Sequence, residues 1–214
     1  MIEQEWDQRY AESDRIWSGQ PNQALVAEVA DLPPGRALDV GCGEGADVVW
    51  LARQGWDVSG LEVSGVALQR ARQHADEAGV AVRWVHSGLV VAALAPAGFD
   101  LVTAFYPALP HADDHAPERA LLHAVAPGGT LLFVHHVIDT VQAAHAHPHP
   151  HPHDDAHEQQ PQFDPADYVM PDDLARLLDA SWTVEVDEVR PRHLTTGAGA
   201  GHSEDRILRA RRLL

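Results

Sequence analysis

The chain has 214 residues, 45% of them hydrophobic, and a formal net charge of -17 at neutral pH. Its length and apolar content predict one domain over residues 1–214 with a full core and exclude a disordered acidic chain. The negative charge disfavours nucleic acid as a partner, and no run approaches the roughly 20 apolar residues that span a bilayer.

The sequence favours a reducing compartment. Cys42 is the only cysteine, so no intrachain disulfide can form. The first seven residues lack the basic start and the apolar run of a signal peptide. We therefore expect a cytoplasmic protein without membrane contact, and the sequence leaves both a monomer and a homodimer open.

Apolar stretches alternate with helical ones along the chain, which is typical of a mostly parallel sheet covered by helices on both faces. We expect an N-terminal lid and helix in residues 1–35. Four further helices are predicted at 46–54, 64–77, 117–125 and 171–180, the second capped by Ser64 and followed by Gly79. The seven predicted strands are residues 37–40, 58–63, 82–86, 99–105, 129–137, 183–189 and 207–211.

A His/Pro-rich segment interrupts this alternation: after His145 and Ala146, histidine and proline alternate from His147 to His153. Proline lacks a backbone donor and favours an extended path, so 139–170 is predicted to be a loop inserted within the domain. Imidazole binds divalent metals well, but this alternation spreads the rings around the chain axis. We favour a solvated loop over weak divalent-metal binding and predict no defined metal site.

The most informative segment is a glycine-rich loop that joins the first predicted strand to a helix. Gly41 and Gly43 allow a tight turn and close contact with a ligand, and Gly45 allows the following helix to pack closely. Glu62 ends the second predicted strand about twenty residues later. A carboxylate at that edge can accept hydrogen bonds from the hydroxyls of a ribose.

The spacing of these glycines differs from the nicotinamide-binding fingerprint, in which the third glycine follows the second by three positions. Asp39, Gly41, Gly43 and Gly45 instead match the first motif of class I methyltransferases that use S-adenosylmethionine, which the chain resembles. The resemblance implies a doubly wound, Rossmann-like α/β fold whose seven-stranded sheet ends in an antiparallel strand. It also implies that the glycine loop contacts the methionine part of the cofactor and that Glu62 holds the ribose.

Further motifs extend this resemblance along most of the chain. Residues 99–102 resemble the fourth strand of the family, and Pro127-Gly128-Gly129 resembles the turn before its fifth. The segments beginning at Trp6 and Trp17 resemble the N-terminal lid of the branch that includes tellurite-resistance and thiopurine methyltransferases. That likeness implies that Tyr10 and Trp17 close over the cofactor.

One position departs from the family pattern. Gly88 stands where family members carry an acidic residue that binds the adenine amino group. The missing acceptor would weaken cofactor binding by about 1 kcal/mol unless Ser87 or backbone groups replace it. We assign the remaining cofactor contacts to Val63, Ser87, Gly88, Leu89 and Ala104.

Methyl transfer from a sulfonium is an in-line displacement, so the protein mainly aligns the two reactants and excludes water. A hydroxyl or amine acceptor also needs a base, whereas a soft anion does not. Tyr106 and His111 follow the fourth strand and are the predicted catalytic residues on the acceptor side. His135 and His136 are adjacent in a strand, so only one of them can face the site. Cys42 is interpreted as a buried filler.

The resulting prediction is S-adenosylmethionine-dependent methyl transfer to a small-molecule acceptor. One alternative is a non-catalytic protein on the same fold that binds the cofactor or captures metal through its histidine-rich loop. A second alternative is a nicotinamide-dependent oxidoreductase, which the glycine spacing disfavours.

Overall fold

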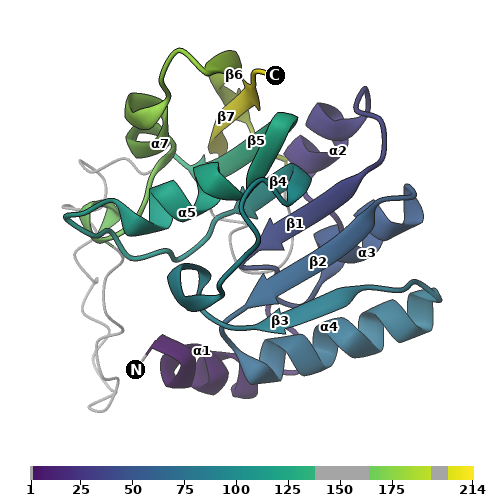
Figure 1. The fold of residues 1–214 in the computed structure, drawn as a ribbon. Coiled ribbons are helices and arrows are strands. Elements are labelled where there is room, and N and C mark those ends of the chain that lie inside the picture. The colour runs from purple at the N-terminus through teal and green to yellow at the C-terminus, as the bar shows by residue number, and fades with distance from the viewer. Residues whose placement is uncertain (1, 138–163, 194–201) are drawn as a thin grey trace.

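The computed structural model describes residues 2–137, 164–193 and 202–214, whose strands form one sheet (Figure 1). The predicted His/Pro-rich insertion at 139–170 lies mostly outside the described residues. Its described end contains a short 3-10 turn, η2 (Pro165–Asp167).

The sheet has the strand order β3-β2-β1-β4-β5-β7-β6. The first five strands in the chain run parallel, and β7 is antiparallel to both of its neighbours. The strands are β1 (Arg36–Val40), β2 (Asp57–Glu62), β3 (Arg83–His86), β4 (Phe99–Phe105), β5 (Val125–His136), β6 (Trp182–Pro191) and β7 (Glu204–Arg212). This arrangement confirms the predicted mostly parallel seven-stranded fold with an antiparallel last strand.

Helices cover both faces of the sheet (Figure 1). One apolar core lies between the sheet and three helices, α2 (Gln23–Val29), α3 (Ala46–Arg53) and α4 (Gly65–Ala78). A second core lies on the other face under α5 (Ala116–Ala124), α7 (Pro171–Leu177) and the 3-10 turn η1 (Leu89–Val91). The N-terminal α1 (Ile2–Ala11) packs against α4 outside the first core.

The order of strands reverses between β1 and β4, because β1 pairs with β2 on one side and with β4 on the other. In a parallel α/β sheet, such a reversal leaves a crevice at the carboxyl ends of the two strands. The glycine-rich loop follows β1 directly, so the fold places it at this crevice.

The bounds of α4 follow its predicted capping residues. The Ser64 hydroxyl accepts a 3.1 Å hydrogen bond from the N–H of Ala67, and Gly79 ends α4 with φ +67°. The largest difference from the predicted boundaries is in β5, which begins at Val125 rather than at Gly129. Val125 pairs with Phe99 before the register shifts, so the strand includes the Pro-Gly-Gly turn as an irregularity.

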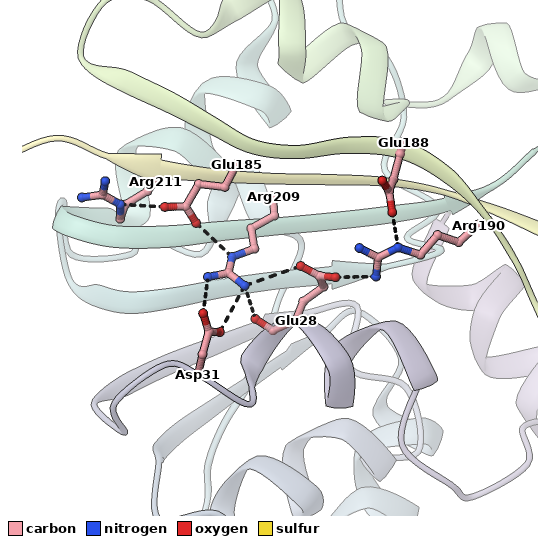
Figure 2. A network of polar contacts seen from close by, with 7 residues as sticks. All are labelled: Glu28, Asp31, Glu185, Glu188, Arg190, Arg209 and Arg211. Carbon is pink, nitrogen blue, oxygen red and sulfur yellow. Dashed lines mark hydrogen bonds and ion pairs between the residues drawn. The ribbon is translucent and has the colours of Figure 1, made fainter.

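An ion-pair network ties α2 to the β6–β7 hairpin (Figure 2). Arg209 donates 2.7 Å to the carbonyl oxygen of Glu28 and pairs with Glu185 at 3.0 Å. It also pairs with Asp31, while Arg190 contacts both Glu28 and Glu188. Because Glu28 is only 5% exposed, this carboxylate depends on its two arginine partners. The network fixes the antiparallel hairpin to the parallel part of the domain.

Candidate functional site

The carboxyl ends of β1 and β4 open onto a cavity of about 360 Å³. This volume is in the range of small-molecule pockets. The cavity is lined by α1 and the segment after it, the glycine loop, the end of β2, η1, the segment after β4 and the start of β7. The crevice predicted by the topology is therefore a real cavity.

The glycine loop turns sharply between β1 and α3. Gly41 and Cys42 both donate their N–H groups to the carbonyl oxygen of Leu61, at 2.8 and 3.1 Å. A Cβ on Gly43 would lie 2.9 Å from the hydroxyl oxygen of Tyr10, and one on Gly45 would lie 2.9 Å from the Cβ of Ala71. The absence of a side chain at Gly43 therefore lets the N-terminal segment pack on the loop, and its absence at Gly45 lets α4 pack against the start of α3.

The Glu62 carboxylate is held beside the loop by backbone donors. It accepts hydrogen bonds from the N–H groups of Gly43, Val63 and Ser64 at 3.0, 2.8 and 2.9 Å. Burial raises the pKa of Glu62, while these donors act in the opposite direction. A carboxylate has about four acceptor positions, so three donors leave room for one ligand hydroxyl.

Beneath the loop lies a group of buried acidic residues. Asp39 accepts a 2.8 Å hydrogen bond from the Thr103 hydroxyl on the neighbouring strand β4. Burial raises the pKa of Asp39 well above its usual range and that of Asp47 to about 6. Burial also raises the pKa of the Cys42 thiol well above its usual value. The protonated thiol agrees with the interpretation of Cys42 as a filler.

The N-terminal segment covers the glycine loop as a lid. Trp17 donates its indole N–H to the Tyr10 hydroxyl at 2.9 Å, directly over Gly43. Both aromatic side chains line the cavity. Because the hydroxyl and the indole nitrogen share one hydrogen bond, the two rings form a single unit of the cavity wall.

Three acidic side chains anchor this lid to the parallel domain. Glu44 accepts from the backbone N–H of Trp17 at 3.0 Å and pairs with Arg70 at 2.9 Å. Asp47 accepts from both the backbone and the side-chain amide of Asn22, each at 2.7 Å. The third acid, Asp7, belongs to the lid itself: its carboxylate accepts a hydrogen bond from the Ser64 hydroxyl at the N-terminus of α4. The lid is thus attached to the same loop that it covers.

Another wall of the cavity comes from the segments that follow β2 and β3. Val63, Ser87, Gly88 and Leu89 all line the cavity there. A Cβ on Gly88 would meet only Val91, at 3.8 Å, so there is open space where family members carry an acidic side chain. The Ser87 hydroxyl donates to the carbonyl oxygen of Gly88 at 3.1 Å. Backbone groups and this hydroxyl are the polar groups that the wall offers at the position of the missing acid.

A second polar cluster lies at the end of the cavity beyond β4. The Tyr106 hydroxyl donates 2.8 Å to one oxygen of Asp205, and Nδ1 of His136 lies 3.2 Å from the other. The Tyr106 and His136 rings stack with their centroids 4.0 Å apart. Since a carboxylate only accepts, the His136 contact places the proton on Nδ1 and leaves Nε2 as a base.

Charges around this cluster favour a neutral imidazole. Burial lowers the pKa of His136, partly offset by its bond to Asp205. Arg192 lies 3.6 Å from the Asp205 carboxylate and over the Tyr106 ring. His202 stacks on His136 with the ring centroids 3.9 Å apart. The arrangement supplies a neutral base, a protonated phenol and a cation at one end of the cavity.

The structure gathers most of the predicted site residues around one cavity. The cavity is lined by Tyr10, Trp17, Asp39, the three glycines, Glu62 and Tyr106, together with Val63, Ser87, Gly88 and Leu89. Ala104 is fully buried in the second core and is not among the lining residues. His111 also lies away from the lining, beside His115 and Glu118.

Sequence reasoning did not identify Asp205, Arg192, Glu44 or Arg70. Asp205 reaches the cluster because β7 pairs with β5 in a register that puts it opposite His136. The only sequence signal for Asp205 was an acidic residue at the start of the last strand. For the contact that anchors the lid, the signal was the glutamate within the glycine loop, Glu44.

The comparisons with known proteins agree with this geometry. The family described as "Methyltransferase domain" matches residues 37–129. A ubiquinone biosynthesis O-methyltransferase from Pectobacterium carotovorum subsp. carotovorum is 39% identical over 99 residues, or 46% of this chain and 41% of that protein. The chain thus spans about two fifths of the length of this curated relative.

Two solved structures share the fold over most of the chain. One, from work on the conversion of a disulfide bond into a thioacetal group during echinomycin biosynthesis, is 25% identical with a TM-score of 0.74. That alignment covers 100% of this chain and 93% of the other. The magnesium protoporphyrin IX methyltransferase of Synechocystis PCC 6803, solved with bound SAH, is 19% identical with a TM-score of 0.58 and covers 88% and 78%. No helix within the described residues has the length and apolar character needed to cross a bilayer.

Proposed function

The chain belongs to the class I methyltransferases, and from this premise we propose that it transfers a methyl group from S-adenosylmethionine to a small-molecule acceptor. The observation that carries the proposal is the carboxylate of Glu62, fixed by the N–H of Gly43 at the cavity edge. It has one acceptor position left for a ribose hydroxyl. The glycine loop beside it leaves space for the methionine end of the cofactor.

The lid also supports a cofactor whose methionine end lies on the glycine loop. Tyr10 and Trp17 cover Gly43, so a ligand on the loop would be shielded from water on that side. The cofactor carries its own activation, and the protein has to align it with the acceptor and exclude water. Adenine would lie against the wall at Ser87 to Leu89, where backbone groups replace the missing carboxylate.

The acceptor would lie between the cofactor and the Asp205 cluster. We assign His136 as the base that takes a proton from the acceptor, Tyr106 as a hydroxyl that orients it, and Asp205 as the residue that positions both. A neutral imidazole is ready to accept a proton. The base is useful for a hydroxyl or thiol acceptor.

Similarity over the full chain favours sulfur as the methylated atom. The relative that matches nearly end to end comes from work on a disulfide converted into a thioacetal, whereas the O-methyltransferase match covers less than half of the chain. We therefore propose a small thiol as the first acceptor class to test, with phenols second. His136 would take the thiol proton as the sulfur attacks the cofactor methyl group, and S-adenosylhomocysteine leaves.

Calorimetric titration with S-adenosylmethionine and S-adenosylhomocysteine tests the cofactor assignment. Glu62→Gln keeps the size of the side chain but removes its charge, so we expect affinity about 10- to 100-fold weaker. Glu77→Gln, an exposed position on α4, is the matched control and should bind like the wild type. Failure of the wild-type protein to bind either ligand at millimolar concentration would overturn the proposal.

Transfer of labelled methyl groups to a panel of thiols and phenols tests the acceptor assignment. Asp205→Asn should keep cofactor affinity but lower the transfer rate, because it removes the partner that orients His136. Glu204→Gln is the control, since it changes a neighbouring exposed carboxylate on β7. Loss of cofactor affinity in Asp205→Asn would contradict the division of the cavity into two ends.

A further inference from the structure

Three side chains outside the cavity lining meet at the start of α5. His111, His115 and Glu118 each offer one ligand atom, and the three atoms lie within 4.8 Å of one another. One carboxylate oxygen of Glu118 lies 3.4 Å from Nδ1 of His111 and 3.4 Å from Nδ1 of His115. Two imidazoles and a carboxylate are a common ligand set of zinc sites in proteins.

These distances suit a tetrahedral metal ion. Bonds of about 2.0–2.1 Å to nitrogen and oxygen put neighbouring ligand atoms roughly 3.4 Å apart. Both contacts to Glu118 already have this length. The imidazoles are 35% and 42% exposed, so they can turn in solvent to close the remaining nitrogen-to-nitrogen distance.

The buried carboxylate gives an independent reason for a cation here. The side chain of Glu118 is fully buried, and its second oxygen has no hydrogen-bond partner among the described residues. A buried carboxylate with an unsatisfied oxygen is costly unless a cation compensates it. A bound metal ion would supply that compensation.

The backbone holds the ligands on a defined turn. His115 caps α5 with φ +53°, a left-handed conformation that is uncommon for a residue with a side chain. Its N–H donates 2.8 Å to the carbonyl of Ala112, and the N–H of His111 donates 2.8 Å to the carbonyl of Asp167. An uncommon conformation at such a position is an indication of a functional constraint.

We propose that His111, His115 and Glu118 form a site for a divalent transition-metal ion of the zinc class. Two nitrogen ligands favour zinc, cobalt or nickel over magnesium and calcium, which prefer oxygen. Three protein ligands leave a coordination position for water. Pro110 precedes His111 and Pro117 precedes Glu118, and both prolines line the cavity, so a bound ion would stiffen that part of its wall. The site does not depend on the proposed methyl transfer.

The test needs a full-length background protein that lacks the imidazoles of the His/Pro-rich segment. In that background, serine replaces His145, His147, His149, His151, His153 and His157. Cobalt absorption and zinc competition against a chromophoric chelator should both detect one bound ion per chain. Binding should weaken at least tenfold in His115→Asn and in Glu118→Gln. His123→Ala, an exposed position on the same helix, should bind like the background protein.

Thermal unfolding with and without zinc provides the second measurement. Zinc should raise the Tm of the background protein and of His123→Ala, but not that of His115→Asn. If Glu118→Gln fails to fold, the double variant His111→Asn/His115→Asn, which changes only partly exposed side chains, takes its place. A background protein that binds no cobalt or zinc at micromolar concentration would overturn the proposal, as would equal affinity in His115→Asn.

Discussion

The Tyr106 hydroxyl donates a 2.8 Å hydrogen bond to Asp205, which lies 99 residues further along the chain. The two residues come from opposite sides of β5, because Tyr106 follows β4 and Asp205 belongs to β7. His136 bonds to the second oxygen of the same carboxylate. A single acidic residue therefore determines the position and the proton of two groups in the cavity.

Asp205→Asn should lower the pKa of His136 further. The bond to Asp205 raises that pKa and opposes the effect of burial, so its loss leaves burial and the charge of Arg192 acting in one direction. Titration of the His136 Cε1 proton by NMR would measure the change, with the signal assigned from a His136→Gln variant. Glu204→Gln should leave the titration unchanged, and an increase in Asp205→Asn would show that the carboxylate does not hold the imidazole as described.

Gly43→Ala should weaken cofactor binding, whereas Gly79→Ala should not. Both glycines have positive φ, +51° and +67°, so alanine costs about 1 kcal/mol of stability at either position. Only at Gly43 would the new methyl group approach the lid, 2.9 Å from the Tyr10 hydroxyl. Nothing lies within 4 Å of a Cβ at Gly79.

Chemical denaturation and calorimetry separate the two effects of these substitutions. Similar losses in the free energy of unfolding are expected for both variants, together with at least a tenfold loss of S-adenosylmethionine affinity in Gly43→Ala alone. Equal cofactor affinity in the two variants would mean that the Tyr10 and Trp17 lid moves away without consequence.

Arg209→Met should destabilise the fold far more than Arg211→Met. Both arginines pair with Glu185, but Arg209 is 12% exposed and also contacts Glu28 and Asp31, whereas Arg211 is 44% exposed. Removing an arginine that is mostly buried and pairs with a buried carboxylate costs about 2–3 kcal/mol, while an exposed pair contributes under about 1 kcal/mol. Urea unfolding at constant m-value measures both losses. Similar losses would show that the network in Figure 2 contributes no more than its surface pair.

The parallel part of the fold could be predicted because most of its strands contain a short apolar run next to glycines or helix caps. Ser64 and Gly79 gave the limits of α4 to within one residue, since capping is local chemistry. The start of β5 could not be predicted in the same way. Its pairing with Phe99 continues through a Pro-Gly-Gly sequence that locally indicates a turn.

The residues of the site also differ in how far local sequence determines their position. Gly41, Gly43 and Glu62 could be identified because their spacing within one β-α-β unit is fixed by the unit itself. Asp205 could not, because its place opposite His136 depends on the register of an antiparallel strand that enters the sheet after two segments, 138–163 and 194–201, outside the described structure. The lid anchor of Glu44 likewise depends on a tertiary contact, with the N–H of Trp17.

His135 should make the free energy of unfolding depend on pH. Burial lowers its pKa from 6.5 to about 4, so the unfolded chain binds a proton between these values that the folded protein does not. The contribution of His135 to stability is therefore complete above pH 6.5 and is lost as the pH falls toward 4. The difference between the two pKa values corresponds to roughly 3 kcal/mol.

The comparison of His135→Phe with the wild type isolates this contribution. Asp47, with its pKa raised to about 6, acts with the opposite sign, because its burial costs stability as the pH rises from 4 to 6. Both proteins contain Asp47, so the difference between their unfolding curves at each pH cancels its effect. That difference should change by roughly 3 kcal/mol between pH 6.5 and 4, with His135→Phe less sensitive to acid. The exposed His123→Gln control should follow the wild type, and parallel curves for His135→Phe and the wild type would show that His135 accepts its proton within the fold.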